Sequence, residues 1–267
     1  MKKFFVSIYI LISLMAMTAG CRAVKFQGLS SEDSLGALSG KQEQKIRVYE
    51  RLKYSIRWMG VEVGTAEGKV EGIEKVKGRD AYHISLRVLS NSVINLIYPV
   101  VDEHHTYIDV KDLHTLRYEK NLQEGRYRAN EVTEYDQEGH TALFHALRSG
   151  DQKEMLIPKH VQDQLSCGYW FRLQPMKPSD TIHIPVNADE KNWDLQVDIL
   201  KYNRLQIENL GYFDAVEVEP HAKFQGVFVR RGKVRAWQGI DERRIPLMMQ
   251  TTIPVLGTVS AILVEYE

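Results

Sequence analysis

The sequence predicts a mainly β protein, built as a curved antiparallel sheet or partial β-barrel with one covering α-helix at about residues 159–173. Two observations predict the sheet. Apolar and polar residues alternate along much of the chain after residue 47, which is the pattern of half-buried strands. Short turns such as Glu124-Gly125 and Glu138-Gly139 separate these stretches, as antiparallel hairpins require.

The first twenty residues predict an export signal. Lys2 and Lys3 precede an apolar run, and Ala19-Gly20 stand directly before Cys21. The segment resembles a bacterial lipoprotein signal peptide, in which the cysteine becomes the lipidated, palmitate-bearing N-terminus. An ordinary secretory signal that is cut elsewhere, or an uncleaved anchor helix, are the alternatives.

The predicted lipid sets the expected location and domain organisation. We expect the protein in the bacterial cell envelope, lipid-anchored and facing the periplasm, with the outer membrane favoured over the inner membrane because Arg22 follows the cysteine. Residues 21–46 are rich in Ser, Gly and polar side chains, which predicts a flexible tether. Residues 47–267 then form a single β-rich domain.

Charge and cysteine content exclude some classes of function. Without Lys2 and Lys3 the chain has 33 basic and 35 acidic residues, so it lacks the positive excess of a nucleic-acid-binding protein. Once Cys21 is lipidated, Cys167 has no partner for a disulfide. Cys167 is therefore interpreted as a packed apolar residue rather than a nucleophile.

The alternating stretches follow one another through the domain and predict its strands. They are Leu52–Trp58, Tyr82–Val88, Thr106–Val110, Thr115–Leu122, Arg126–Tyr135, Thr141–Leu147, Lys153–Ile157, Asp180–Val186, Trp193–Lys201 and a closing set from Asn203 to Tyr266.

One segment has helical spacing instead. Val161, Leu165 and Tyr169 recur at every fourth position between Pro158 and Pro175, which predicts a helix that covers a sheet face.

Glycines recur at every fourth position in one predicted strand, at Gly60, Gly64, Gly68 and Gly72. In an extended strand all four would point to the same face. A nearly bare face favours sharp bending of the sheet over a ligand contact.

These segments together resemble the bacterial exported proteins grouped as domain of unknown function number 3108. The resemblance is carried by Leu52-Lys-Tyr54, Met59-Gly60-Val61, Gly64, Asp163–Arg172, Val216–Pro220, Trp237–Pro246, Gly257, Leu263 and Tyr266. It implies a curved, largely antiparallel sheet around a helix in the cell envelope, with no established activity and no catalytic residues to carry over.

Catalytic motifs give no support for an enzyme. The sequence contains no GxSxG, Walker or HExxH motif and no paired cysteines at metal spacing, so no catalytic residue, metal or cofactor is predicted. The metal-like segment Asp102–His105, with Tyr107, Asp109 and His114 nearby, is interpreted as a solvated strand edge. His104 and His105 would point to opposite faces of a strand.

Large rings and clustered cations are the candidate ligand-binding residues: Trp58, Trp170, Phe171, Trp237, Arg230, Arg231, Lys233 and Arg244. The rings could line an apolar cleft, and the cations could meet phosphates of lipid or lipopolysaccharide. The alternatives are that most rings form core, that the cations protect exposed strands from aggregation, and that Arg244 pairs with Asp241 at a turn.

Two functions of different classes remain. In the first, a noncatalytic envelope lipoprotein binds a lipid, acyl chain, lipopolysaccharide or glycan in the curved sheet. In the second, a structural or assembly lipoprotein docks an envelope protein partner. Both place the chain at a membrane through its N-terminal lipid.

Overall fold

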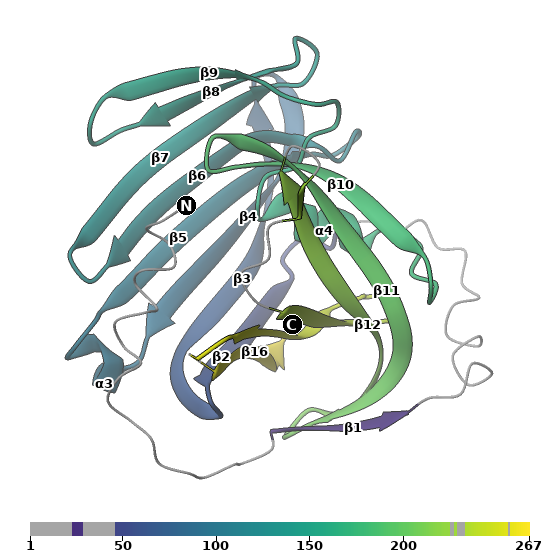
Figure 1. Cartoon of the computed structure of the whole chain (residues 1–267). Coiled ribbons are helices and arrows are strands. Elements are labelled where there is room, and N and C mark those ends of the chain that lie inside the picture. The colour runs from purple at the N-terminus through teal and green to yellow at the C-terminus, as the bar shows by residue number, and fades with distance from the viewer. Residues whose placement is uncertain (1–22, 29–45, 225–226, 229–232, 256) are drawn as a thin grey trace.

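In a computed structural model, most of the chain forms one strongly curved antiparallel sheet (Figure 1). The structure describes residues 23–28, 46–224, 227–228, 233–255 and 257–267. The sheet curls into an open, barrel-like wall, and the predicted fold class is confirmed. Cys21 lies outside the described residues.

The first half of the domain is a simple meander in which each strand pairs with the next. Its strands are β2 (Arg51–Trp58), β3 (Val61–Val76), β4 (Arg79–Ser90), β5 (Val100–Asp109), β6 (Thr115–Glu124), β7 (Tyr127–Asp136), β8 (Thr141–Ala146) and β9 (Asp151–Leu156).

The second half extends the same sheet from its other side, because the last strand pairs with β2. These strands are β10 (Thr181–Ala188), β11 (Lys191–Ile207), β12 (Gly211–Phe224), β13 (Val227–Phe228), β14 (Lys233–Gly239), β15 (Pro246–Ile253) and β16 (Gly257–Tyr266). The order across the sheet runs β11-β12-β14-β15-β16-β2-β3 and onward to β9.

The predicted helix is shorter than expected, because α4 spans only Ser166–Arg172. Residues before it hydrogen-bond to strands instead of to one another: the Gln162 N–H donates to the Pro185 carbonyl, and the Asn187 N–H donates to the Gln162 carbonyl. His160 also has a φ of 54°, which a right-handed helix excludes. The segment therefore runs along β10 and adds backbone contacts where the sheet is open. A second, four-residue helix, α3 (Ser92–Asn95), joins β4 to β5.

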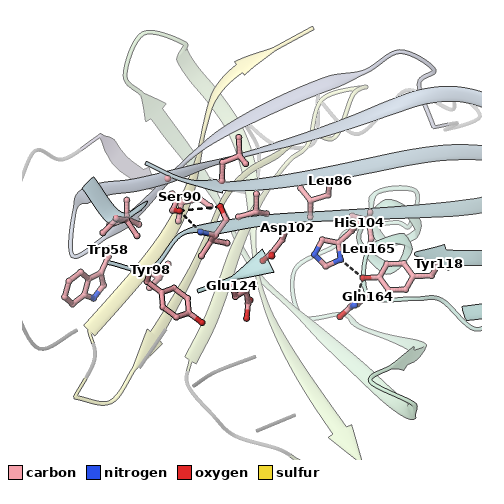
Figure 2. A pocket seen from close by; sticks show the side chains of 18 residues that line it. Trp58, Leu86, Ser90, Tyr98, Asp102, His104, Tyr118, Glu124, Gln164 and Leu165 are labelled. Atoms are coloured by element: carbon pink, nitrogen blue, oxygen red, sulfur yellow. Dashed lines mark hydrogen bonds between the residues drawn. The ribbon is translucent and has the colours of Figure 1, made fainter. Parts of the chain in front are cut away.

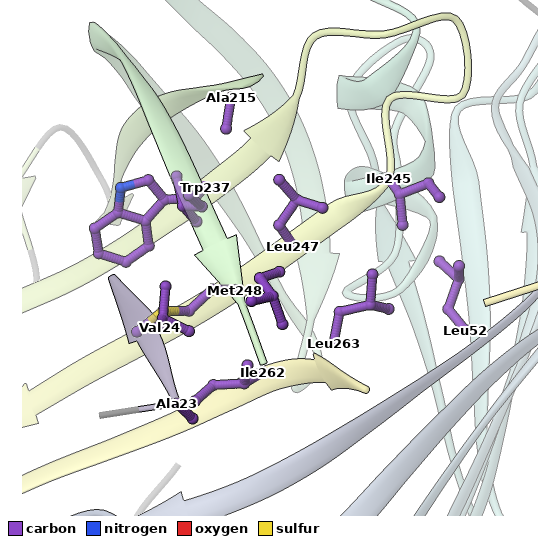
Figure 3. Close-up of a cluster of buried hydrophobic side chains, with 12 residues drawn as sticks. Ala23, Val24, Leu52, Ala215, Trp237, Ile245, Leu247, Met248, Ile262 and Leu263 are labelled. Atoms are coloured by element: carbon purple, nitrogen blue, oxygen red, sulfur yellow. The ribbon is translucent and has the colours of Figure 1, made fainter. Parts of the chain in front are cut away.

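The expected tether is also wrong in part, because β1 (Val24–Gly28) lies within it and pairs with β11. Ala23 and Val24 are buried in a cluster with Trp237, Met248 and Ile262 (Figure 3). Local alternation is too short here to predict a strand, since the partner, Ile207, lies far along the chain.

The glycines of β3 do not all share one face. Gly60 lies in the turn before the strand, and a bulge between Val70 and Gly72 interrupts the alternation. Gly64 and Gly68 do face inward and are buried. A Cβ on Gly64 would collide with the backbone carbonyl of Leu89. This glycine therefore permits a close approach of β4 that any larger residue would prevent.

A buried ion pair fixes α4 against the sheet. The guanidinium of Arg172 donates to both carboxylate oxygens of Glu50, at 2.6 and 2.8 Å, just before β2. Burial opposes the charge on Arg172, but its hydrogen bonds to Glu50 raise its pKa. Among the described residues, no helix has the length and apolar character needed to cross a bilayer.

Candidate functional site

The inner face of the curved sheet holds a cavity of about 430 Å³, within the range of ligand sites. Its walls are mostly apolar, and they come from strands β2 to β6, α3, the segment before α4, and β16. The lining residues are Ile56, Trp58, Val63, Gly64, Leu86, Val88, Leu89, Ser90, Ile94, Tyr98, Val100, Asp102, His104, Tyr118, Glu124, Gln164, Leu165 and Val259.

Alternation along β4 and β5 explains which side chains face the cavity. Leu86 and Val88 alternate with outward residues on β4, and Val100, Asp102 and His104 do so on β5. Figure 2 shows Trp58 and Tyr98 at one end of the cavity, while His104 and Tyr118 lie at the other.

Buried polar groups are placed among these apolar walls. Asp102 accepts a hydrogen bond from the Gln123 N–H at 3.0 Å and shares another with the side chain of Glu124. Burial raises the pKa of Asp102. Both carboxyl groups can accept a hydrogen bond from a ligand, and a carboxyl group that is protonated can also donate one.

His104 and Tyr118 form the polar end of the cavity. Nδ1 of His104 lies 2.6 Å from the Tyr118 hydroxyl, which also accepts a hydrogen bond from the Gln164 amide. Burial, together with the charge of Lys120, lowers the pKa of His104 to about 4. The imidazole is therefore neutral at pH 7 and adds no positive charge to the cavity.

The segment that closes this end is held by Asp163, which is fully buried. One carboxylate oxygen accepts from the N–H groups of Leu165 and Ser166, and the other accepts from the hydroxyls of Thr106 and Thr115. These four bonds fix the chain between β9 and α4. Gln164 and Leu165 are thereby held against the cavity.

A second, polar cavity of about 380 Å³ lies beyond Tyr118 and Gln164, which line both. Lys120 faces it and forms ion pairs with Glu131 and Asp189 at 2.9 and 3.5 Å. The pair Tyr118 and Gln164 therefore separates an apolar space from a charged one.

The aromatic residues predicted to bind a ligand lie in different places in the structure. Trp58 lines the cavity. The prediction that Phe171 and Trp237 line the cleft is wrong, because both are buried in core clusters, and Trp170 packs beside the cluster that contains Phe171. Ring size alone cannot distinguish a core residue from a cavity residue.

The predicted cations are also separated. Lys233 is exposed at the start of β14, whereas Arg230 and Arg231 lie outside the described residues. The Arg244 guanidinium donates to the carbonyls of Arg172 and Gln174, so it is not free to meet a phosphate. Asp241 accepts from the Arg244 backbone N–H at 2.9 Å rather than from its side chain.

The segment Asp102–His105 is part of a strand as expected, but β5 lies between β4 and β6 rather than at a solvated edge of the sheet. Asp102 and His104 are buried and face the cavity, while His105 lies on the other face, 3.0 Å from a ring nitrogen of His83. The residue types Asp and His mark this segment in the sequence, but they do not show that Asp102 and His104 face a cavity. That position depends on how β5 pairs with β6, which also brings Glu124 beside them.

Asp109, Asp112 and His114 could together present metal-ligand atoms within 4.8 Å of one another. Arg79, however, forms ion pairs with both carboxylates. Since this guanidinium already neutralises the acids, the cluster is explained as a structural ion pair network at the β5–β6 turn.

Together, the curved antiparallel sheet and its apolar inner cavity define a barrel-like β protein whose sheet is not closed. The family model described as "Protein of unknown function (DUF3108)" matches residues 53–264, and the chain belongs to this family.

One solved structure of low sequence identity has a similar fold. A β-barrel-like protein of domain of unknown function DUF1849 from Brucella abortus aligns with a TM-score of 0.58 at 8% identity, covering 83% of this chain and 98% of that one. A putative exported protein with a YmcC-like fold from Bacteroides fragilis covers 84% of this chain and 98% of its own, with a TM-score of 0.31 and 9% identity. No curated protein matches the sequence.

Proposed function

We propose that the protein is a noncatalytic lipoprotein of the bacterial cell envelope that holds an acyl chain in the cavity of its curved sheet. The observation that carries this proposal is the lining of the 430 Å³ cavity, which is predominantly aliphatic and aromatic. An acyl chain gains free energy by leaving water for such walls, at about 25 cal/mol per Å² of buried apolar surface. A glycan would instead need a polar lining.

The polar groups of the cavity suit the carbonyl or hydroxyl of a lipid. Burial raises the pKa of Asp102, which lies beside Glu124, and His104 is neutral, so the cavity offers polar groups without a strong positive charge. An ester or hydroxyl group therefore fits this lining better than a phosphate, which favours arginine or lysine donors.

The experiment is mass spectrometry of lipids extracted from the full-length protein, compared with two matched variants. Leu86→Trp fills the cavity from the inner face of β4, whereas Arg87→Trp adds the same ring to the outer face. We expect a stoichiometric lipid in the wild type and in Arg87→Trp, and its loss in Leu86→Trp. Equal lipid in all three would contradict binding in the cavity. An empty wild type that captures one envelope protein would favour the assembly function.

The anchor is proposed at Cys21, supported by the signal-like sequence before it. Cells grown with radiolabelled palmitate test it directly. We expect Cys21→Ser to lose the label and Cys167→Ser to keep it, because burial raises the pKa of the Cys167 thiol to about 12 and leaves it unreactive. Label retained in Cys21→Ser would contradict the anchor. We propose that the anchored domain faces the periplasm, in the outer membrane rather than the inner one.

A further inference from the structure

One end of the sheet exposes an unusual number of large apolar side chains. They lie on the β2–β3 turn, on the connection between β4 and β5 that contains α3, and on the β15–β16 turn. The exposed residues are Met59 (63%), Val61 (55%), Val93 (57%), Leu96 (87%), Ile97 (66%) and Val255 (102%). We call these three connections the apolar rim.

Hydrogen bonds hold the three connections side by side. The Met59 N–H donates to the Thr258 carbonyl at 2.8 Å, and the Asn91 N–H donates to the Val63 carbonyl at 2.9 Å. The Asn91 side chain also caps α3 by accepting from the Ile94 N–H. The exposed apolar side chains therefore belong to one ordered surface rather than to separate loops.

The sequence of the apolar rim is as unusual as its exposure. Residues 58–61, 88–101 and 245–264 contain no charged residue at all. By contrast, the turns at the other ends of the same strands carry charges, such as Lys77 between β3 and β4 and Lys111 between β5 and β6. Soluble proteins rarely expose a large contiguous apolar patch, and such patches mark protein, membrane or ligand contacts.

The cavity begins at this same end. Trp58, Ile94, Tyr98 and Val259 belong to the rim connections or adjoin them, and all four line the cavity. Figure 2 shows Trp58 and Tyr98 at the end remote from His104. Tryptophan and tyrosine favour the boundary between water and lipid, because each combines an apolar ring with a polar tip.

The start of the chain points to a membrane rather than a protein as the contact. Lys25 and Phe26 of β1 line a common hollow with Met59 and Gly60 of the β2–β3 turn. Cys21 precedes the buried Ala23 by two residues, so their Cα atoms lie at most about 8 Å apart. An acyl group on Cys21 would therefore enter the bilayer close to the apolar rim.

We infer that the apolar rim docks on the lipid bilayer, so that the cavity opens toward the membrane. The orientation rests on the proposed lipid at Cys21. The inference adds to the proposed function a membrane-contacting surface formed by residues 58–61, 93–98 and 253–255. In this orientation an acyl chain passes between bilayer and cavity along apolar side chains, without crossing water.

The test uses the full-length lipidated protein with Cys167→Ser, reconstituted in phosphatidylethanolamine–phosphatidylglycerol vesicles that contain a spin-labelled phospholipid. An environment-sensitive fluorophore is attached at Leu96→Cys or, separately, at Val93→Cys in the apolar rim. The matched control is Lys111→Cys, an exposed position on the β5–β6 turn at the opposite end. We expect both rim labels to shift to shorter wavelength and lose most of their emission, while the control label keeps its emission.

Rim labels quenched no more than the control label would overturn the inference. The two proposals fail separately. If lipid is extracted from the cavity but the rim labels stay unquenched, only the docking surface is wrong. If the rim labels are quenched but the cavity yields no lipid, the membrane surface stands and the carrier function is wrong.

Discussion

The carboxylate of Glu50 accepts two hydrogen bonds from the guanidinium of Arg172, and both side chains are almost completely buried. The same guanidinium donates to the carbonyls of Arg243 and Arg244 and stacks on the Tyr169 ring at 5.1 Å. One side chain thus joins α4, the approach to β2 and the β14–β15 turn.

Removing one partner of this pair should be strongly destabilising. Arg172→Met removes both hydrogen bonds to the buried Glu50 carboxylate and leaves only the Arg243 guanidinium, 3.9 Å away, as its counter-charge. We expect a loss of about 3–5 kcal/mol in the free energy of unfolding. The double variant with Glu50→Leu should recover part of that loss, because no lone charge remains. Urea denaturation followed by circular dichroism measures both.

The control for this prediction is an exposed pair. Lys153 and Glu190 lie 3.0 Å apart with both side chains substantially exposed, so Lys153→Met should change the free energy of unfolding by less than about 1 kcal/mol. A similar small effect of Arg172→Met would mean that the buried pair does not hold α4 in place.

His104 should make the fold sensitive to acid. Its pKa is about 4 in the folded protein and about 6.5 when unfolded, so the unfolded state takes up the proton first as the pH falls. The contribution of neutral His104 to the free energy of unfolding is therefore fully present when the pH is above the pKa of the unfolded state. It declines as the pH falls below that pKa, by about 2 kcal/mol between pH 7.5 and pH 5. His104→Gln cannot titrate in this range. Unfolding midpoints at the two pH values should differ less in the variant, and an unchanged difference would contradict the buried neutral imidazole.

Replacing Asp163 even by asparagine, its closest analogue in shape, should destabilise the protein. The carboxylate accepts all four of its hydrogen bonds, so Asp163→Asn replaces one acceptor oxygen by an NH₂ group. That group either faces two backbone N–H donors or requires the Thr106 and Thr115 hydroxyls to accept instead of donate, and Thr115 Oγ1 already accepts from the Asp163 N–H. We expect a loss of about 2–3 kcal/mol, typical of unsatisfied buried groups. Thr115→Val in the Asp163→Asn background should cost less than Thr115→Val alone, because the bond is already lost. Additive losses in this double-mutant cycle would show that the two groups do not interact.

Sequence periodicity predicts most strands here because alternation is local and each meander strand pairs with its neighbour. It fails where pairing is remote. Val24 pairs with Ile207, which is remote in the sequence, so composition alone predicts a tether where β1 forms. Val161 and Leu165 have helical spacing, yet the backbone between them bonds to β10, and the helix begins only at Ser166.

The candidate site could be predicted only in part, because the pairing of strands decides which side chains meet in the cavity. Trp58 and Trp237 are both candidates because of their large rings, yet Trp58 lines the cavity and Trp237 lies in the core. Glu124 is an ordinary turn acid in the sequence. It becomes part of the site only because β5 and β6 pair in a register that places it beside Asp102.

Gly64 provides the sharpest test of how closely β3 and β4 must approach. Its missing side chain leaves room for the Leu89 carbonyl, and any Cβ would force the two backbones apart. Gly64→Ala should therefore lower the free energy of unfolding by about 1–3 kcal/mol and, because Gly64 lines the cavity, reduce the amount of lipid that copurifies. Gly68→Ala is the matched control on the same face of the same strand, where the nearest atom, the Tyr169 hydroxyl, lies 3.8 Å from the added Cβ. That is ordinary contact, so Gly68→Ala should keep both stability and lipid. Equal effects of the two substitutions would mean that β-strand propensity, and not the close approach at Leu89, explains why glycine stands at these positions.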